Sequence, residues 1–186
     1  MNEAKKYDII YMDPPWQYHF GGPMSSGSSI EKHYSTMSHQ EMLDMDIASL
    51  ANPDCLLYMW TTSTHMKKAI EIGDYWGFDY KVVAFVWDKV APVTGYYTMG
   101  QTEFVLCFKR RGGQIPKPRG SRGTRQMLVE SKREHSRKPD EIRRRIEEMH
   151  PTQSKLEMFA RVSMPGWDVW GNEVDKFNEE PTSGLF

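Results

Sequence analysis

Short apolar runs alternate with amphipathic segments along most of the chain. Seven runs are rich in Val, Ile, Leu, Met, Phe, Tyr and Trp and predict strands at residues 7–12, 55–60, 81–87, 103–109, 127–130, 155–160 and 167–170. Helical patterns lie between several of them. Strands that alternate with helices are typical of an α/β fold with a largely parallel sheet, in which ligands bind at the carboxyl ends of the strands.

Three segments carry helix-start or helix-stop residues. Ser38 and Glu41 have capping-box spacing, and the apolar residues that follow predict one helix with a single buried face: Met42, Leu43, Ile47 and Leu50. A second helix is expected over 64–76, ending at Gly77. A third begins near Pro139, which suits a first helical turn, with Ile142, Ile146 and Met149 as its buried stripe.

Length and composition indicate one globular unit. The chain has 186 residues, of which 39% are hydrophobic and 26% charged, so we expect a single domain over 1–186. No apolar run approaches the length of a membrane span, and the N-terminus lacks the features of a signal peptide. These features predict a cytoplasmic protein without membrane contact.

The potential metal ligands are few and scattered. The two cysteines, Cys55 and Cys107, each lie in an apolar run and are expected to be reduced core thiols. The six histidines form no pair with metal-ligand spacing, so no metal site is predicted.

The net charge of −1 conceals a strongly basic region. Residues 109–145 hold fourteen Lys or Arg and four Asp or Glu, and the rest of the chain is correspondingly acidic. Within this region, a Gly-, Pro- and Arg-rich stretch predicts a mobile cationic loop that follows phosphates. We expect two substrate loops, at about 17–36 and 90–126, and nucleic-acid contacts from Arg119, Arg122 and Arg125.

An unusual tetrapeptide, Asp13-Pro14-Pro15-Trp16, directly follows the first predicted strand. It combines a carboxylate and rigid carbonyl acceptors with an aromatic ring. Methylation of an aromatic amine requires such groups, because acceptors for the two amine hydrogens favour a tetrahedral nitrogen with its lone pair free. A flat ring can also stack on an extruded base.

With these residues the chain resembles the DPPW family of adenine-N6 methyltransferases, which includes the catalytic subunit of the messenger-RNA adenosine methyltransferase and bacterial and phage enzymes. Further matching segments occur in the family's order at 34–38, 57–60, 76–78, 86–89, 135–142, 155–161 and 171–173. The resemblance implies a Rossmann-like fold in circularly permuted order, with the catalytic motif first and the cofactor motif last. It also implies S-adenosylmethionine as the cofactor.

The resemblance also implies roles for individual residues. Asp13, Pro14 and Pro15 would form the catalytic loop that holds the target amine, and Trp16 and Tyr34 would contact the base. Residues implied to hold the cofactor are Asp13, Lys138, Glu157, Phe159, Arg161, Asn172 and Glu173. A buried acid at position 157 needs a partner, and ribose hydroxyls would supply one. By contrast, Arg143, Arg144 and Arg145 are expected on the wet face of a helix, paired with Glu147 or Asp140 or touching phosphate.

Alternatives remain at this point. The chain is predicted to methylate adenine, with DNA favoured over RNA because the chain is short and carries no added RNA-binding module. It could instead be a non-catalytic nucleic-acid-binding subunit of a methyltransferase complex, or a methyltransferase that acts on a protein amide. The intact acidic tetrapeptide and the basic region favour the first hypothesis. A homodimer or a heteromeric partner subunit is also compatible with the sequence.

Overall fold

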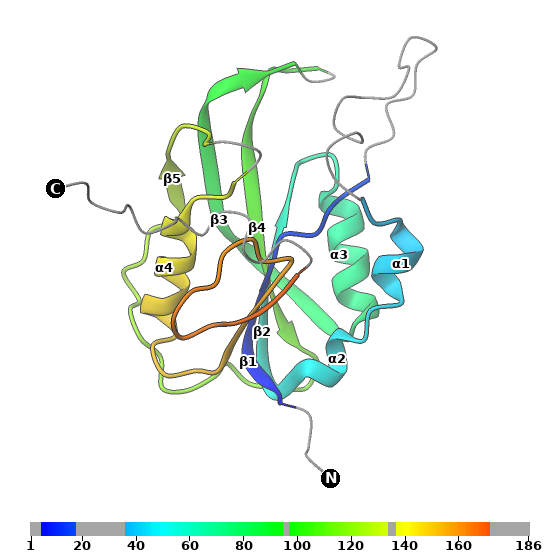
Figure 1. The fold of residues 1–186 in the computed structure, drawn as a ribbon, viewed down its shortest axis with the longest axis vertical. Helices are drawn as coiled ribbons and strands as arrows, with labels where there is room; N and C mark the ends of the chain where they lie inside the picture. Colours follow the sequence, from blue (N-terminus) through cyan, green and yellow to red (C-terminus); the bar gives the residue numbers. More distant parts are fainter. Residues whose placement is uncertain (1–4, 18–35, 95–96, 134–136, 172–186) are drawn as a thin grey trace, which may run out of the picture.

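A single seven-stranded sheet forms the centre of the molecule (Figure 1). The computed structural model describes residues 5–17, 36–94, 97–133 and 137–171. The strand order across the sheet is β5-β3-β4-β2-β1-β6-β7. The strands are β1 (Tyr7–Met12), β2 (Ala51–Thr61), β3 (Phe78–Val93), β4 (Gly100–Arg110), β5 (Met127–Val129), β6 (Lys155–Met158) and β7 (Asp168–Trp170).

Six of the seven strands point in the same direction. β1 pairs in parallel with β2 and β6, β6 with β7, and β3 with β5. β4 alone runs antiparallel, between β2 and β3. We call the side where the six parallel strands end the carboxyl edge and the opposite side the amino edge. The prediction of a largely parallel sheet is confirmed, and the residues that begin β4 join the carboxyl edge.

Helices cover both faces of the sheet. The helices α1 (His39–Leu43), α2 (Ile47–Leu50) and α3 (Met66–Tyr75) lie on one side and α4 (Asp140–Met149) on the other (Figure 1). The alternation of side chains along β1 explains this arrangement. Ile10 and Met12 belong to the core beneath α1–α3, whereas Ile9 and Tyr11 pack in the core beneath α4.

The single helix expected after Ser38 is in fact two. The predicted capping box is present, because the Ser38 side chain accepts from the Glu41 backbone and Glu41 accepts in return from the Ser38 backbone. However, α1 ends at Leu43, and the carboxylate of Asp46 accepts from the Ser49 backbone to begin α2. The second cap competes with helix continuation, so the apolar residues reach the core from two short helices.

The expected loop over 90–126 is also corrected. β3 continues to Val93 and β4 begins at Gly100, so the first part of this range is a β-hairpin arm and only the part after Arg110 lacks strands until β5. Hydrogen bonding to the neighbouring strand extended β3 beyond its apolar run. The other expected loop, 17–36, lies almost wholly outside the described residues.

Residues with positive φ angles mark the end of one helix and of one strand. Gly77 adopts φ +82° directly after α3, which confirms it as the helix stop. β6 was expected to reach residue 160, but Phe159 has φ +59°, a left-handed conformation that ends the strand at Met158. Cys55 and Cys107 are free and buried, as predicted. None of the described helices has the length and apolarity to cross a bilayer.

A buried histidine lies beneath the last turn of α4. His150 is 3% exposed, and its Nε2 lies 2.9 Å from the Tyr58 hydroxyl, while its Nδ1 has no hydrogen-bond partner among the described residues. Burial, with the nearby charges of Lys155 and Arg119, lowers the pKa of His150 to about 4. The folded protein therefore holds this ring neutral.

Acid should destabilise the protein through His150. The unfolded ring takes up a proton near its ordinary pKa of 6.5, but the folded ring does so only near 4, so stability falls as the pH drops through this window. From about pH 7 to about pH 5 this group should cost about 2 kcal/mol. His150→Gln keeps a hydrogen-bonding side chain that does not titrate, and urea unfolding at both pH values should show a smaller loss for it. An equal loss in both proteins would contradict the assignment.

Candidate active site

The tetrapeptide Asp13-Pro14-Pro15-Trp16 follows β1 at the carboxyl edge, and several hydrogen bonds hold it. The Pro14 carbonyl accepts from the Trp16 backbone at 2.8 Å, and the Pro15 carbonyl accepts from the Met37 backbone at 3.0 Å. Two prolines with fixed φ and these bonds make the turn rigid. Each carbonyl retains a second lone pair for a ligand.

Trp16 anchors this turn inside the protein. Its ring is 6% exposed, and its Nε1 donates to the Trp60 carbonyl at 3.1 Å. The ring stacks on His65 with centroids 5.5 Å apart and an interplanar angle of 27°. Trp16 does not line the cleft described next. These contacts hold the turn in place, and stacking of Trp16 on a base stays a prediction.

A cleft opens at the carboxyl edge beside Asp13. It encloses about 470 Å³ when the open space at its mouth is included. Residues from the ends of β1, β2 and β6, the start of α4 and the segments beside them line it: Tyr11, Asp13, Trp60, Arg137, Lys138, Pro139, Asp140, Arg143, Glu157, Phe159, Arg161 and Val162. Acids, bases and aromatic rings therefore face a common space.

Lys138 links two carboxylates at one end of this cleft. Its Nζ lies 3.1 Å from Asp13 Oδ2 and 3.2 Å from Glu103 Oε2. The other oxygen of Glu103 pairs with Lys89 Nζ at 3.1 Å, so four charges of alternating sign form a chain. The Lys138 ammonium also lies 5.5 Å from the centroid of the Trp60 ring.

This chain determines the protonation of its members. Burial would lower the pKa of Lys138, but Asp13 and Glu103 outweigh it and the pKa is raised. Burial likewise opposes ionisation of Glu103, yet Lys138 and Lys89 hold its pKa below the ordinary value. For Asp13 burial prevails and raises the pKa, although Lys138 counteracts it. Lys138 is thus a permanent cation beside a carboxylate with a raised pKa.

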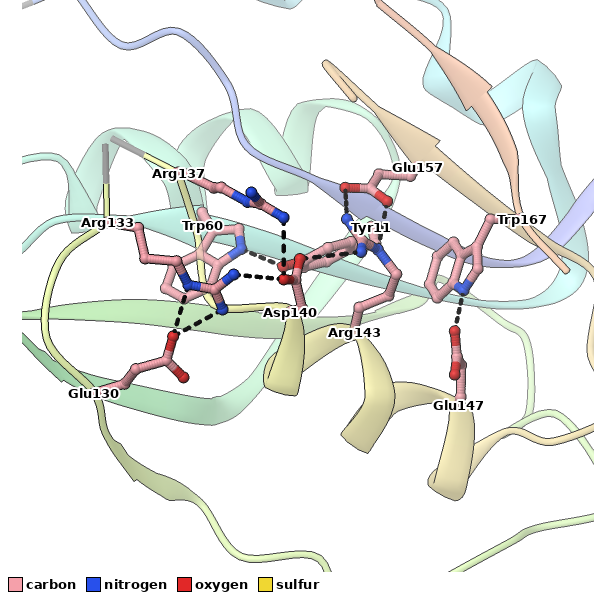
Figure 2. Close-up of polar contacts among 10 residues, drawn as sticks. All are labelled: Tyr11, Trp60, Glu130, Arg133, Arg137, Asp140, Arg143, Glu147, Glu157 and Trp167. Atoms are coloured by element: carbon pink, nitrogen blue, oxygen red, sulfur yellow. Dashed lines mark hydrogen bonds and ion pairs between the residues drawn. The ribbon is translucent and has the colours of Figure 1, made fainter. Parts of the chain in front are cut away.

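A buried ion pair also lines the cleft, and Figure 2 shows its two residues. Arg143 of α4 donates to both oxygens of Glu157 in β6, at 2.7 and 2.9 Å, in a bidentate arrangement. The expectation for Arg143 is corrected, because it is 8% exposed and faces the sheet. Arg144 and Arg145 pair with acids of their own helix, but their shared partner is Glu141 and not the expected Glu147 or Asp140. The partner of Glu157 in the fold is therefore an arginine, although each carboxylate oxygen can accept a further bond.

Asp140 gathers further arginines at the start of α4 (Figure 2). Its carboxylate contacts Arg133 at 2.6 Å, Arg137 at 3.3 Å and Arg143 at 3.5 Å. Burial opposes ionisation of Asp140, but these guanidinium groups, led by Arg133, hold its pKa below its usual value. The acid also suits the positive end of the helix dipole. This cluster fixes the segment that carries Lys138.

The structure brings together all five described residues that were predicted for the cofactor. Asp13, Lys138, Glu157, Phe159 and Arg161 all line the one cleft. Tyr34, Asn172 and Glu173 lie outside the described residues.

Arg119, Arg122 and Arg125 lie elsewhere. They precede β5, which begins at the amino edge, and the backbone of Gly120 donates to Met149 at the end of α4. The cleft lies at the other end of this ten-residue helix, about 15 Å away. The structure does not bring these arginines to the target-amine site.

Three polar residues of the site were not predicted from the sequence. Glu103 and Lys89 lie at or near the ends of predicted strands and were given no role, and Arg143 was expected on the solvent-exposed face of its helix. A charged residue at the end of an apolar run was the available sign for Glu103 and Lys89. For Arg143 it was the spacing of three residues to Ile146, which belongs to the predicted buried stripe. Among the described residues no group of His, Cys, Asp and Glu could hold a metal ion.

Comparisons with known proteins place the chain in a family. The MT-A70 family matches residues 7–173. The type II methyltransferase M.MunI of Mycoplasma sp. is 43% identical over 198 aligned residues, which cover 97% of this chain and 83% of that protein.

Eukaryotic relatives are more distant and much longer. The human N(6)-adenosine-methyltransferase catalytic subunit METTL3 is 28% identical over 177 residues, and an MT-A70-like N(6)-adenosine-methyltransferase of Arabidopsis thaliana is 29% identical over 175. This chain spans only 28% and 24% of their lengths. The family match covers the described sheet and the residues that line the cleft. The chain belongs to the MT-A70 family.

Proposed function

We propose that this chain transfers a methyl group from S-adenosylmethionine to the exocyclic N6 of adenine in DNA. The observation that carries the proposal is the Asp13 carboxylate, which follows β1 on a rigid Pro-Pro turn and faces a charged cleft. Membership of the MT-A70 family supports the reaction, since relatives in it are named N(6)-adenosine methyltransferases. DNA is favoured because M.MunI, which matches almost end to end, is a type II methyltransferase, a class that acts on DNA.

The groups that line the cleft fit S-adenosylmethionine. The cofactor has a carboxylate, an ammonium group, a ribose diol and a flat base. Lys138, just before the start of α4, suits the carboxylate. Glu157 retains lone pairs for ribose hydroxyls beyond its bonds to Arg143, and Phe159 offers an apolar face.

Each residue of the turn has a task in this chemistry. Bound S-adenosylmethionine supplies a methyl group on a positively charged sulfur. Asp13 and the Pro14 carbonyl accept the two hydrogens of the adenine N6, which directs the nitrogen lone pair toward the methyl carbon. The transfer would break the sulfur–methyl bond of the cofactor as the N6–carbon bond forms, and the cofactor would leave as a neutral thioether. The Asp13 carboxylate would stabilise the positive charge that passes to N6 until water takes the proton. The Trp16 anchor holds both acceptors in place.

The order of the strands suits a Rossmann-like methyltransferase in permuted form. β1 carries the catalytic turn and lies beside β6, which comes late in the chain and carries Glu157. We therefore place the catalytic motif first and the cofactor motif last. Localisation in the cytoplasm and a homodimer or partner subunit stay predictions.

Asp13→Asn should remove methylation while the fold remains. The amide has nearly the same shape, but it carries no charge and turns one acceptor into a donor, so we expect at least a ~100-fold loss of rate. The protein would be incubated with S-adenosylmethionine and unmethylated DNA or RNA, and N6-methyladenine would be measured by mass spectrometry after digestion. Asp79→Asn, at an exposed ion pair, is the matched control. Full activity of the Asp13 variant would overturn the proposal.

Wild-type results in the same assay separate the alternatives. Product in DNA and not in RNA supports the proposal as stated. Product in neither polymer, with cofactor bound, would indicate a non-catalytic subunit or a protein substrate.

Glu103→Gln should slow the reaction about tenfold and change its pH profile. The carboxylate of Glu103 raises the pKa of Asp13, so its neutral replacement should move the acid limb of activity to lower pH. Rates between about pH 5 and about pH 9 would be compared with those of Glu71→Gln, an exposed acid on α3. A slower enzyme with an unmoved acid limb would show that Glu103 serves packing alone.

A further inference from the structure

The Gly-, Pro- and Arg-rich segment 113–126, here called the basic segment, has a fixed backbone at the amino edge. Gln114 N–H donates to Asp54 Oδ1 at 2.7 Å, and Gln153 donates to the Pro118 carbonyl at 3.0 Å. Gly120 and Ser121 N–H groups donate to the carbonyls of Met149 and Glu148, at 2.9 and 2.7 Å. These bonds satisfy carbonyls at the end of α4 that the helix itself leaves unpaired.

Gly120 makes this close approach feasible. A Cβ at this position would lie 2.0 Å from the Glu148 carbonyl oxygen, so only glycine fits. Further along, Arg145 of α4 donates to the Arg125 carbonyl at 2.9 Å. The segment was predicted to be a mobile loop, but its backbone is fastened to α4 at several points.

Its cationic side chains are exposed and differ from the other arginines of the region. Lys117, Arg119, Arg122 and Arg125 are all exposed. In the part of the chain that the structure describes, none of them pairs with a carboxylate. Other arginines of the region do, among them Arg111, Arg133, Arg143, Arg144 and Arg145. Carboxylates of the fold therefore pair with these other arginines, whereas the four cations of the basic segment face solvent.

The row suits a phosphate backbone better than a protein surface. No aromatic residue occurs between 111 and 126, whereas protein interfaces are enriched in aromatic residues and depleted in lysine at their core. Arg125 lies eight positions after Lys117, which limits the distance between them to at most ~27 Å, the rise of roughly eight nucleotides of one strand. Four exposed cations within this reach can contact several phosphates of one strand.

We propose that Lys117, Arg119, Arg122 and Arg125 form a second DNA contact surface, separate from the catalytic cleft, that binds the phosphates of the duplex flanking the target adenine. The length of α4 separates the two surfaces by about 15 Å, or roughly four to five base pairs of rise. The surface adds affinity without reading sequence, and the cleft selects the base. The identity of the polyanion rests on the proposed function.

The test compares two triple variants of the full chain. Arg119→Gln/Arg122→Gln/Arg125→Gln removes three charges from the basic segment. Lys67→Gln/Lys68→Gln/Lys81→Gln removes three exposed charges elsewhere, two on α3 and one on β3. Binding of a 30-base-pair duplex of random sequence would be followed by fluorescence anisotropy at several salt concentrations. The thermal midpoint of each variant confirms that it is folded.

The arginine variant should bind at least tenfold more weakly, and its plot of log affinity against log salt should be shallower by about 2 to 3, since each lost phosphate contact removes about 0.9 from the slope. The lysine variant should retain the wild-type slope. In methylation assays the arginine variant should show a raised KM for DNA with kcat within twofold.

Two results would overturn the proposal. An unchanged salt slope in the arginine variant would mean that these cations do not contact DNA, and an acidic protein partner would then be the better candidate. A loss of kcat at saturating DNA would mean that the arginines take part in the reaction. Because the anisotropy assay needs neither cofactor nor methyl transfer, its outcome is independent of the proposed chemistry. Wild-type protein that binds no DNA in it would instead count against DNA as the substrate.

Discussion

One ammonium group, largely enclosed by the protein, joins the parts of the candidate active site. Lys138 lies between Asp13, which follows β1, and Glu103, near the start of β4. A charge removed from water is strongly unfavourable unless it is paired, so the segment before α4 must lie where both carboxylates can reach it. This arrangement determines where the Asp13 carboxylate, the start of α4 and the mouth of the cleft lie.

The Arg143–Glu157 pair provides the second tie between α4 and the sheet. Its two parallel hydrogen bonds fix the side chain of Glu157 within an apolar strand, and they fix the rotation of α4 about its axis. The apolar residues Ile142 and Ile146 of the same helix pack on the sheet beside this pair. Hydrophobic burial thus holds α4 on the sheet, and the ion pairs determine where its first turn lies.

The positive charge of the chain serves two purposes. Near the cleft, guanidinium groups are matched by carboxylates such as Asp140 and Glu157, and they organise the protein itself. On the basic segment the cations face solvent above a backbone that is bonded to α4. A net charge of −1 would not indicate a polyanion-binding protein, because the distribution of charge, and not its sum, determines the local field.

The sequence by itself determined the parts of this protein that depend on neighbouring residues. Apolar periodicity located the strands, the Ser38 capping box and Gly77 marked helix ends, and Asp13-Pro14-Pro15-Trp16 after an apolar strand indicated the chemistry. The family resemblance supplied Lys138, Glu157, Phe159 and Arg161, which the fold does bring to one cleft.

The tertiary structure decided which distant residues meet. Glu103 reaches the site because β4 runs antiparallel, a direction set by pairing with β2 and β3 and not by any residue near position 103. Trp16 is buried because His65 and the Trp60 carbonyl receive it. Arg119, Arg122 and Arg125 lie at the amino edge because their backbone caps α4. Local sequence specifies local conformation, but strand direction, burial and charge pairing are settled only when the whole core packs.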